Sequence, residues 1–286
     1  MNLQDVKTVG VVGSGLMGNG IAQIIAQAGY PVVFCDVSIE IVKKGYDAIA
    51  GRLKKDIAKG KKTTDEVEAV LNRIKPTQNY EDLKDVDFMF EAIFENMDVK
   101  KKFYSQIDAI CKPECIFATN TSGLSITEIA SVTKRASQVI GTHFFNPVPV
   151  MELLEVIRGY STSEETYQLT LEVGKKIGKT TITVQEAPLF CVNRILVPML
   201  NEAMFVLSEG IATKEDIDTG MRLGANHPIG PLALADLVGL DTLLMVMETL
   251  YRETADSKYR PCPLLVKMVR AGCYGRKNGK GFYTYQ

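Results

Sequence analysis

A glycine-rich segment near the start of the chain most constrains what this sequence can fold into. Gly13-Ser14-Gly15-Leu16-Met17-Gly18 follows the apolar run at 9–12 and leads into a helical pattern that closes at Gly29. A second apolar run, at 32–35, ends directly before Asp36. A Gly-x-Gly-x-x-Gly segment alone is weak evidence, but a dinucleotide-binding βαβ unit requires this order of strand, glycines, helix, strand and acidic residue. We therefore expect the chain to begin with a Rossmann-type unit.

Each part of this segment has a physical task in binding a dinucleotide. Gly13 and Gly15 permit a tight turn and a close approach of the backbone to a pyrophosphate, and Gly18 lets the helix pack against the strand. The amides at the start of the helix, around Leu16 and Met17, are expected to donate to phosphate oxygens. The alternative interpretation is that the glycines only shape a strand–helix turn.

Asp36 indicates which dinucleotide would bind. It lies 18 residues after Gly18, where a carboxylate can accept hydrogen bonds from both hydroxyls of the adenosine ribose. The same charge would repel a 2′-phosphate, so the sequence predicts NAD rather than NADP as the cofactor.

Apolar runs and amphipathic stretches alternate through the first half of the chain. Predicted strands follow at residues 88–93, 116–118, 139–141, 153–157 and 181–184. Runs without polar alternation are typical of a parallel sheet covered on both faces. Beyond Pro188 the segments become long and helical in period. We expect an α/β fold, with a Rossmann-type, doubly wound, mostly parallel sheet over residues 1–185 and an all-α C-terminal domain over residues 186–286.

Bulk properties exclude several classes of protein. A net charge of −1 over 286 residues favours neither nucleic-acid nor membrane-surface binding. No apolar run reaches the roughly 18 residues that span a bilayer, and the N-terminus lacks a signal-peptide layout, so a cytoplasmic location is expected. The six cysteines are too sparse for a disulfide framework and lack metal-ligand spacing, so no metal site is expected.

Histidine is scarce, which narrows the search for an acid–base group. The chain holds two, His143 and His227. His143 comes just after the apolar run at 139–141, at the predicted carboxyl end of a strand, which is the edge where open α/β sheets bind ligands. His227 precedes Pro228 and is predicted to be a turn residue. A lone histidine is more often structural than catalytic, but this position makes His143 the candidate base beside a nicotinamide.

Glu155 interrupts the otherwise apolar run at 153–157. Because burying an unpaired carboxylate is costly, it needs a cationic or hydrogen-bonding partner. An imidazole would suit it, since the carboxylate can accept from the second ring N–H and stabilise the imidazolium. The alternative is a strand-edge glutamate that faces solvent.

Two further polar segments are weaker candidates. Thr119-Asn120-Thr121-Ser122 follows a predicted strand and places hydroxyls and an amide at the same ligand edge, unless it only caps the helix that begins near Ile126. Asn193-Arg194 opens the helical domain.

Lys55 and Lys59 belong to a basic stretch, residues 43–62, that contains eight Lys or Arg. The two lysines are four residues apart and would share a helix face. That face would contact a phosphorylated ligand tail or would simply be solvated.

Together these segments resemble the 3-hydroxyacyl-CoA dehydrogenase family over nearly the whole chain. The most specific pieces are GTHFFNPVPVME at 141–152, VNR at 192–194, NHPIGP at 226–231 and GRKNGKGFY at 275–283. The likeness is strongest to stand-alone bacterial members, which act on 3-hydroxybutyryl-CoA in butyrate-producing pathways.

The resemblance implies catalytic roles for four residues. His143 would be the general base and Glu155 its orienting carboxylate. Ser122 and Asn193 would hold the substrate oxygen.

Binding roles also follow from the resemblance. Glu95 and Lys100 would lie near the nicotinamide-side ribose, and Asn120 would also bind the cofactor. The basic helix would meet the phosphates of CoA, which favours Lys55 and Lys59 as substrate-binding residues.

The activity that the resemblance implies is NAD-dependent interconversion of a short-chain (S)-3-hydroxyacyl-CoA and the 3-ketoacyl-CoA. Family members are usually dimers, so a homodimer through the C-terminal helical domain is expected.

Two alternative functions stay open. A dehydrogenase of another hydroxy acid, such as a sugar acid, would have no use for the Lys55/Lys59 face. A non-catalytic NAD-sensing protein would need neither His143 nor Glu155.

Three positions depart from the family pattern. Gly123 stands where a second serine is common, Leu189 where glycine is usual, and Ile93-Phe94 where smaller residues are common beside the nicotinamide. None removes a proposed catalytic residue. They bear instead on the chain-length preference and on the hinge between the domains.

Overall fold

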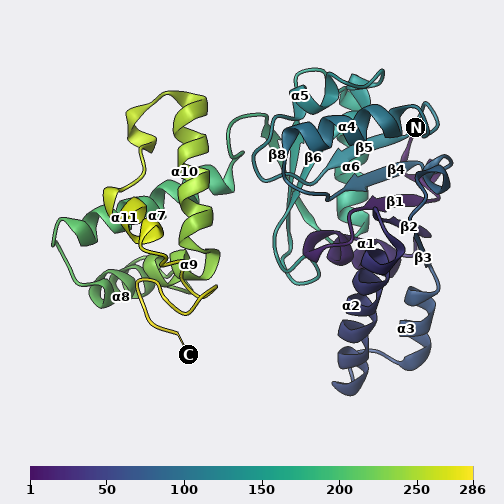
Figure 1. Cartoon of the computed structure of the whole chain (residues 1–286). Coiled ribbons are helices and arrows are strands. Elements are labelled where there is room, and N and C mark those ends of the chain that lie inside the picture. The colour runs from purple at the N-terminus through teal and green to yellow at the C-terminus, as the bar shows by residue number, and fades with distance from the viewer. Residues whose placement is uncertain (286) are drawn as a thin grey trace. The chain divides into compact units, whose positions relative to one another are not determined.

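The computed structural model describes residues 1–285, which form two compact units. The first is Met1–Phe190 and the second begins at Cys191 (Figure 1). The first unit thus ends five residues beyond the boundary that the sequence suggested at 185.

The first unit is built on one sheet. Its strands are β1 (Val9–Val12), β2 (Val32–Cys35), β3 (Ile74–Thr77), β4 (Phe88–Glu91), β5 (Ile116–Thr119), β6 (Val139–Phe144), β7 (Leu153–Arg158) and β8 (Thr180–Gln185). They lie in the order β3-β2-β1-β4-β5-β6-β7-β8. Among the described strands every neighbouring pair is parallel except β6 with β7. The expected mostly parallel, doubly wound sheet is confirmed.

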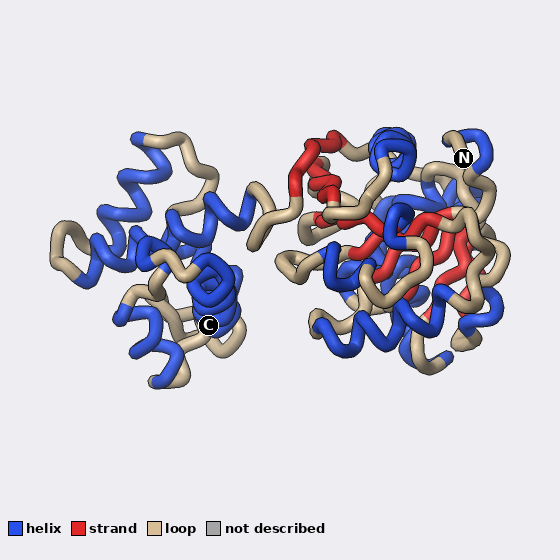
Figure 2. The backbone as a smooth tube through the Cα atoms, turned by 90° about the horizontal axis from the view of Figure 1, so that it is seen from above, coloured by secondary structure: helices blue, strands red, loops and turns tan. Residues whose placement is uncertain are grey.

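Helices cover both faces of this sheet. They are α1 (Leu16–Gln27), α2 (Ile39–Ala58), α3 (Thr64–Leu71), α4 (Met97–Asp108), α5 (Ile126–Ala130) and α6 (Glu164–Lys176). One core cluster joins side chains of α1, α2, α3 and α6 to the sheet, and a second joins those of α4 and α5 to the other face. Figure 2 shows the strands enclosed between helices. Strands β1, β4 and β5 are buried along their whole length, which explains why their sequences are largely apolar without polar alternation.

Strand β3 was not predicted from the sequence. Its residues, Ile-Lys-Pro-Thr, include the exposed Lys75 and the proline Pro76, which lack the apolar character of the central strands. It lies at the edge of the sheet beside β2, where a missing N–H and a charged side chain are tolerated.

The second unit is helical, as expected. Its helices are α7 (Val192–Ser208), α8 (Lys214–Gly224), α9 (Pro231–Val238), α10 (Leu240–Thr254) and α11 (Pro263–Arg270). The buried Asp236 anchors the final segment by accepting hydrogen bonds from the amides of Phe282 and Tyr283 and from the hydroxyl of Tyr285. A Cβ at Gly281 would lie 1.9 Å from the Asp236 carboxylate. The glycine-rich piece near the C-terminus is therefore a packing element of this unit.

Candidate active site

The turn between β1 and α1 forms a cradle suited to a pyrophosphate. Gly13 adopts a φ of +92°, and a Cβ at this position would lie 2.4 Å from the carbonyl oxygen of Ala92. A Cβ at Gly18 would lie 1.7 Å from the carbonyl oxygen of Gly13, whereas one at Gly15 would meet no atom within 4 Å. The first and third glycines thus allow close packing, and the second leaves its surface open to a ligand beside the N-terminus of α1. This geometry fits a dinucleotide.

Asp36 lies at the end of β2 beside this cradle. Its Oδ2 accepts hydrogen bonds from the Ser14 amide (2.6 Å) and the Ser14 hydroxyl (2.7 Å), and its Oδ1 accepts from the Val37 amide (2.7 Å). Three donors hold the carboxylate in one orientation at the rim of a cavity of about 750 Å³.

The same cavity contains a residue pair that the sequence suggested would lie near the nicotinamide. Ile93 and Phe94 line it together with Asp36, Val37 and Ile41. These apolar side chains thus share a cavity with the Asp36 carboxylate, and their expected place beside the nicotinamide stays a prediction.

His143 and Glu155 meet across neighbouring strands. They occupy directly opposed positions in the antiparallel pair β6–β7, and His143 Nδ1 lies 2.6 Å from Glu155 Oε2. The Glu155 side chain is fully buried and the imidazole is 6% exposed. The alternative of a solvent-facing Glu155 is therefore wrong, and the imidazole partner suggested by the sequence is the one observed. With Nδ1 facing a carboxylate, Nε2 is the ring nitrogen that can exchange a proton with a ligand.

Aromatic side chains surround the His143 ring. The Phe145 ring centroid lies 4.5 Å from that of the imidazole, and the Phe190 centroid lies 5.9 Å away. These two aromatic rings pack beside the imidazole and contribute to its burial.

The segment after β5 is held by Glu95. Its Oε1 accepts from the Thr121 hydroxyl (2.5 Å) and from the Ser122 amide (2.8 Å). Asn120 uses its side-chain oxygen to accept from the Phe144 amide at 3.0 Å, next to His143. The side chain of Ser122 is exposed, so its hydroxyl is accessible to a ligand. The structure thus brings Ser122, Asn120 and Glu95 to the sheet edge that carries His143.

Lys100 is fully buried between two carboxylates. Its side chain is 0% exposed, and its ammonium lies 2.5 Å from Glu91 Oε1 and 3.5 Å from Glu95 Oε2. Glu91 is also fully buried and accepts from the Thr119 hydroxyl and the Ile93 amide. Lys100 thus contacts Glu95, the residue expected beside it at the nicotinamide-side ribose, and its role in cofactor binding stays a prediction.

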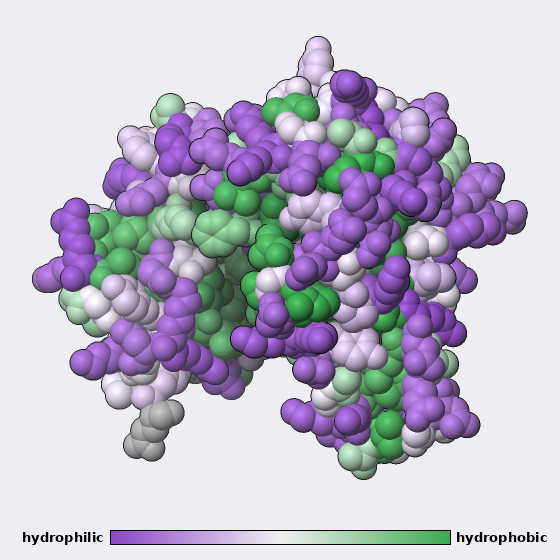
Figure 3. All heavy atoms as spheres, turned by 45° about the vertical axis from the view of Figure 1, so that its right-hand side comes forward, coloured by the Kyte–Doolittle hydropathy of each residue, from purple (hydrophilic) through white to green (hydrophobic). Residues whose placement is uncertain are grey.

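The proposed CoA-binding lysines are exposed, as a contact with a ligand tail requires. Lys55 lies near the end of α2 and Lys59 caps it. Both side chains are exposed, and hydrophilic side chains flank the hairpin of α2 and α3 (Figure 3). A helix face that only contacts solvent would be exposed as well, so the binding of CoA phosphates by Lys55 and Lys59 stays a prediction.

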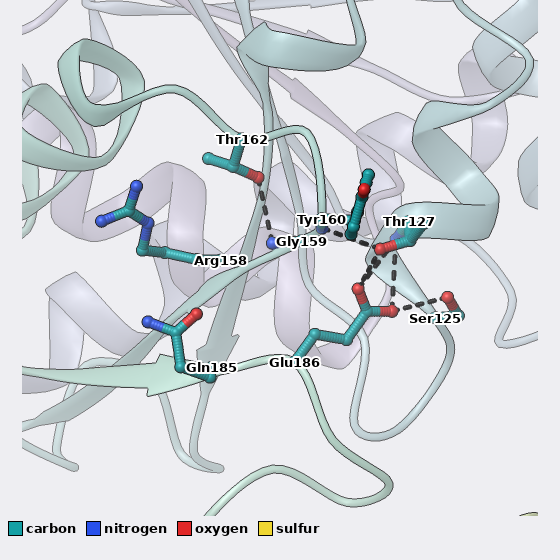
Figure 4. Close-up of a pocket in the computed structure, with 8 residues that line it drawn as sticks. All are labelled: Ser125, Thr127, Arg158, Gly159, Tyr160, Thr162, Gln185 and Glu186. Carbon is teal, nitrogen blue, oxygen red and sulfur yellow. Dashed lines mark hydrogen bonds between the residues drawn. The ribbon is translucent and has the colours of Figure 1, made fainter.

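A second cavity in the first unit, of about 730 Å³, has polar walls. Figure 4 shows Glu186 reaching toward Ser125 and Thr127, while Arg158 and Gln185 lie on the other side. Glu186 accepts from the Ser125 hydroxyl (2.5 Å) and from the amide and hydroxyl of Thr127. These bonds cap the first turn of α5, so the role of Glu186 here is structural.

The remaining predicted residues lie in or beside the second unit. Asn193 occupies the first turn of α7, and His227 is partly exposed after α8, where its amide donates to the Met221 carbonyl at 3.2 Å. Residues 1–285 contain no group of three or more His, Cys, Asp or Glu side chains that could hold a metal ion. Within the same residues no helix combines the length and the hydropathy that crossing a membrane requires.

Sequence reasoning missed Glu91 and Glu186. Glu91 ends an apolar strand, so the cost of burying a carboxylate, which singled out Glu155, would have predicted a cationic partner for it too. Glu186 follows β8 in an unremarkable polar context, and no local pattern identifies its partners, which are about 60 residues away.

The sheet, the glycine cradle and the Asp36 carboxylate define a dinucleotide-binding protein of the Rossmann type. Two family models cover nearly the whole chain: the 3-hydroxyacyl-CoA dehydrogenase NAD-binding domain matches residues 8–187, and the C-terminal domain of the same family matches residues 190–285. The chain therefore belongs to the 3-hydroxyacyl-CoA dehydrogenase family, and NAD is its cofactor.

Individual relatives agree with this assignment. A probable 3-hydroxybutyryl-CoA dehydrogenase of Bacillus subtilis is 51% identical over 99% of this chain and 98% of its own length. The human mitochondrial hydroxyacyl-coenzyme A dehydrogenase is 42% identical over 98% of this chain and 92% of its own. The crystal structure of (S)-3-hydroxybutyryl-CoA dehydrogenase PaaH1 from Ralstonia eutropha is 53% identical, covers 99% of this chain and 100% of that one, and superposes with a TM-score of 0.97.

Proposed function

We propose that this enzyme interconverts a short-chain (S)-3-hydroxyacyl-CoA, with 3-hydroxybutyryl-CoA as the main substrate, and the corresponding 3-ketoacyl-CoA, with His143 as general acid and base. The observation that carries the proposal is the buried His143–Glu155 pair, at 2.6 Å, in the same sheet as the strand that leads into the dinucleotide cradle. The names of the relatives support the four-carbon acyl-CoA.

In the oxidative direction Nε2 of His143 accepts the proton of the 3-hydroxyl. NAD, when bound, supplies the hydride acceptor. Glu155 accepts from Nδ1–H, which selects the tautomer with a free lone pair on Nε2, and its charge stabilises the imidazolium that forms. In the reductive direction the protonated ring returns the proton to the developing alkoxide. Acid–base catalysis of this kind contributes about 10²–10⁴-fold.

Ser122 would orient the substrate oxygen for this transfer. Its amide is fixed by Glu95, so the hydroxyl projects from a held backbone rather than from a free loop. Holding the reacting atoms in register supplies much of the remaining acceleration. The contribution of Asn193 to the same oxygen stays a prediction.

Lys55 and Lys59 would contact the phosphates of CoA from the exposed end of α2. Association into a homodimer through the helical unit, a cytoplasmic location and a place in fatty acid or butyrate metabolism are proposed on the family resemblance alone.

The decisive experiment follows the oxidation of NADH with acetoacetyl-CoA, free acetoacetate and keto forms of sugar acids as parallel substrates. We expect turnover with acetoacetyl-CoA, and a kcat/KM for the free acids that is several orders of magnitude lower. Efficient turnover of a sugar-acid substrate would favour a different hydroxy-acid dehydrogenase. Tight NADH binding without turnover of any of these substrates would favour a sensor.

A further inference from the structure

Two bulky residues end the first unit in a backbone conformation that suits glycine. Leu189 and Phe190 have φ angles of +61° and +59°. Residues other than glycine rarely adopt this backbone conformation, because the Cβ atom causes steric strain. Both side chains are 3% exposed. A strained backbone of this kind persists only where the surrounding packing over-determines it. The side-chain contacts of Leu189 and Phe190 must therefore hold this turn.

Leu189 packs against Gly123, which follows Ser122 directly. A Cβ built at Gly123 would lie 2.8 Å from Leu189 Cδ2, and the next two nearest atoms, at 3.9 Å, are Leu189 Cα and N. The space beside Gly123 is therefore occupied by one residue, Leu189. Gly123 is partly buried, and a side chain at this position would meet the end of the Leu189 side chain, so the two fit together only if that leucine side chain moves.

The same turn also reaches the candidate base. The Phe190 ring lies 5.9 Å from the His143 ring, at an angle of 56° between the planes. Leu189 and Phe190 are consecutive, so one turn contacts the segment of Ser122 and the ring of His143. The Ser122 segment is otherwise tied down by Glu95 and by the bond from the Gly123 amide to the Thr121 hydroxyl at 3.3 Å.

We propose that Gly123 and Leu189 form a size-matched pair that sets the position of the Ser122 hydroxyl relative to His143, which makes Leu189 a positioning residue for the reaction. The proposal rests on the function proposed above, because it assigns Ser122 and His143 to the same substrate oxygen. A displacement of about 1 Å between such groups can lower the rate by about 10²-fold.

The test is a double-variant cycle with Gly123→Ser, Leu189→Gly and the combination. Gly123→Ser alone should lower kcat with acetoacetyl-CoA by about 10-fold or more, with a smaller change in KM and with the dissociation constant of NADH nearly unchanged. Adding Leu189→Gly should restore most of the lost kcat, since glycine adopts the positive φ freely and vacates the space that the serine needs. Gly220→Ser is the matched control, because a Cβ at Gly220 meets no atom within 4 Å, and it should keep wild-type kinetics.

A thermal-unfolding cycle on the same variants separates this proposal from the proposed function. The melting temperatures should be non-additive, with the double variant more stable than the sum of the single changes predicts. Wild-type kinetics for Gly123→Ser, or additive losses of kcat in the combination, would overturn the positioning role. If the wild-type protein does not reduce acetoacetyl-CoA, the proposed function fails, and additive melting temperatures would then refute the size-matched pair on their own.

Discussion

Two buried pairs of a carboxylate and a nitrogen base lie in the same sheet-based unit and differ in what they can do. His143 and Glu155 are 2.6 Å apart with exposed fractions of 6% and 0%. Lys100 and Glu91 are 2.5 Å apart and both 0% exposed. Distance and burial are thus almost the same in the two pairs.

The difference is in the base and in its surroundings. An imidazole exchanges protons near neutral pH and has a second nitrogen, whereas an ammonium remains a donor only. Lys100 is also shared with Glu95, which in turn holds Thr121 and the Ser122 amide. We infer that the first pair moves a proton and that the second positions the segment on which a substrate oxygen would rest. A short, buried contact by itself therefore does not identify a catalytic pair.

The largest expected effect is on the first pair. His143→Gln removes the proton acceptor while keeping a polar side chain of similar size, so kcat should fall by about 10²–10⁴-fold, with NADH binding nearly unchanged. Steady-state kinetics with acetoacetyl-CoA and fluorescence titration with NADH measure the two quantities. His227→Gln, at the other histidine, is the control and should leave kcat close to the wild-type value. Comparable losses in both variants would contradict the assignment.

The second pair should respond in stability rather than in chemistry. Lys100→Met leaves the Glu91 carboxylate buried without its cation, and breaking a buried pair in this way typically lowers the free energy of unfolding by about 3–5 kcal/mol. Denaturant unfolding measures it. The adjacent Lys101 pairs with Glu128 at 2.5 Å, but these side chains are 32% and 48% exposed, so Lys101→Met should lower the same free energy by only about 0.2–1 kcal/mol. Equal effects would show that the Lys100–Glu91 pair contributes no more than a surface pair.

A third variant measures how much the charge of Glu155 contributes to kcat. Glu155→Gln keeps an oxygen that can accept from Nδ1–H but removes the charge that stabilises the imidazolium. The loss of a charged hydrogen bond, worth about 1.5–3 kcal/mol, should lower kcat by about 10- to 100-fold. Turnover measured beside that of His143→Gln gives the order of the two effects. An undiminished kcat would leave Glu155 with a purely structural role.

The smallest effect is expected where charges are exposed rather than buried. Replacing Lys55 and Lys59 by alanine should raise KM for acetoacetyl-CoA by about 3- to 10-fold at low salt, and the difference should shrink at high ionic strength because exposed charges are screened. Lys43 and Lys44 are exposed on the same helix, and their replacement by alanine is the matched control. An equal rise of KM for both double variants would indicate a general effect of charge rather than a site.

The sequence predicted most of the architecture of the first unit because its central strands, such as β1, β4 and β5, are fully buried and therefore largely apolar. Strand β3 was not predicted, because an edge strand tolerates Lys75 and Pro76 and therefore lacks an apolar run. Glu155 was identified as a buried carboxylate because it stands in an apolar run. Glu91 stands in a similar context, yet its partner Lys100 could be found only when α4 was folded against the sheet.

The dinucleotide-binding turn, the acidic residue after β2 and the scarcity of histidine can all be recognised in the amino-acid sequence alone. These follow from short-range properties, namely periodicity, turn geometry and residue chemistry, which neighbouring residues specify. Which of the candidate side chains contact one another depends on how the chain folds. The antiparallel register of β6 and β7 places His143 opposite Glu155, and the turn at Leu189 fills the space beside Gly123, 66 positions earlier in the chain. Electrostatic and packing energies depend on distance through space, so contacts between such remote segments are settled only when the sheet and its covering helices are in place.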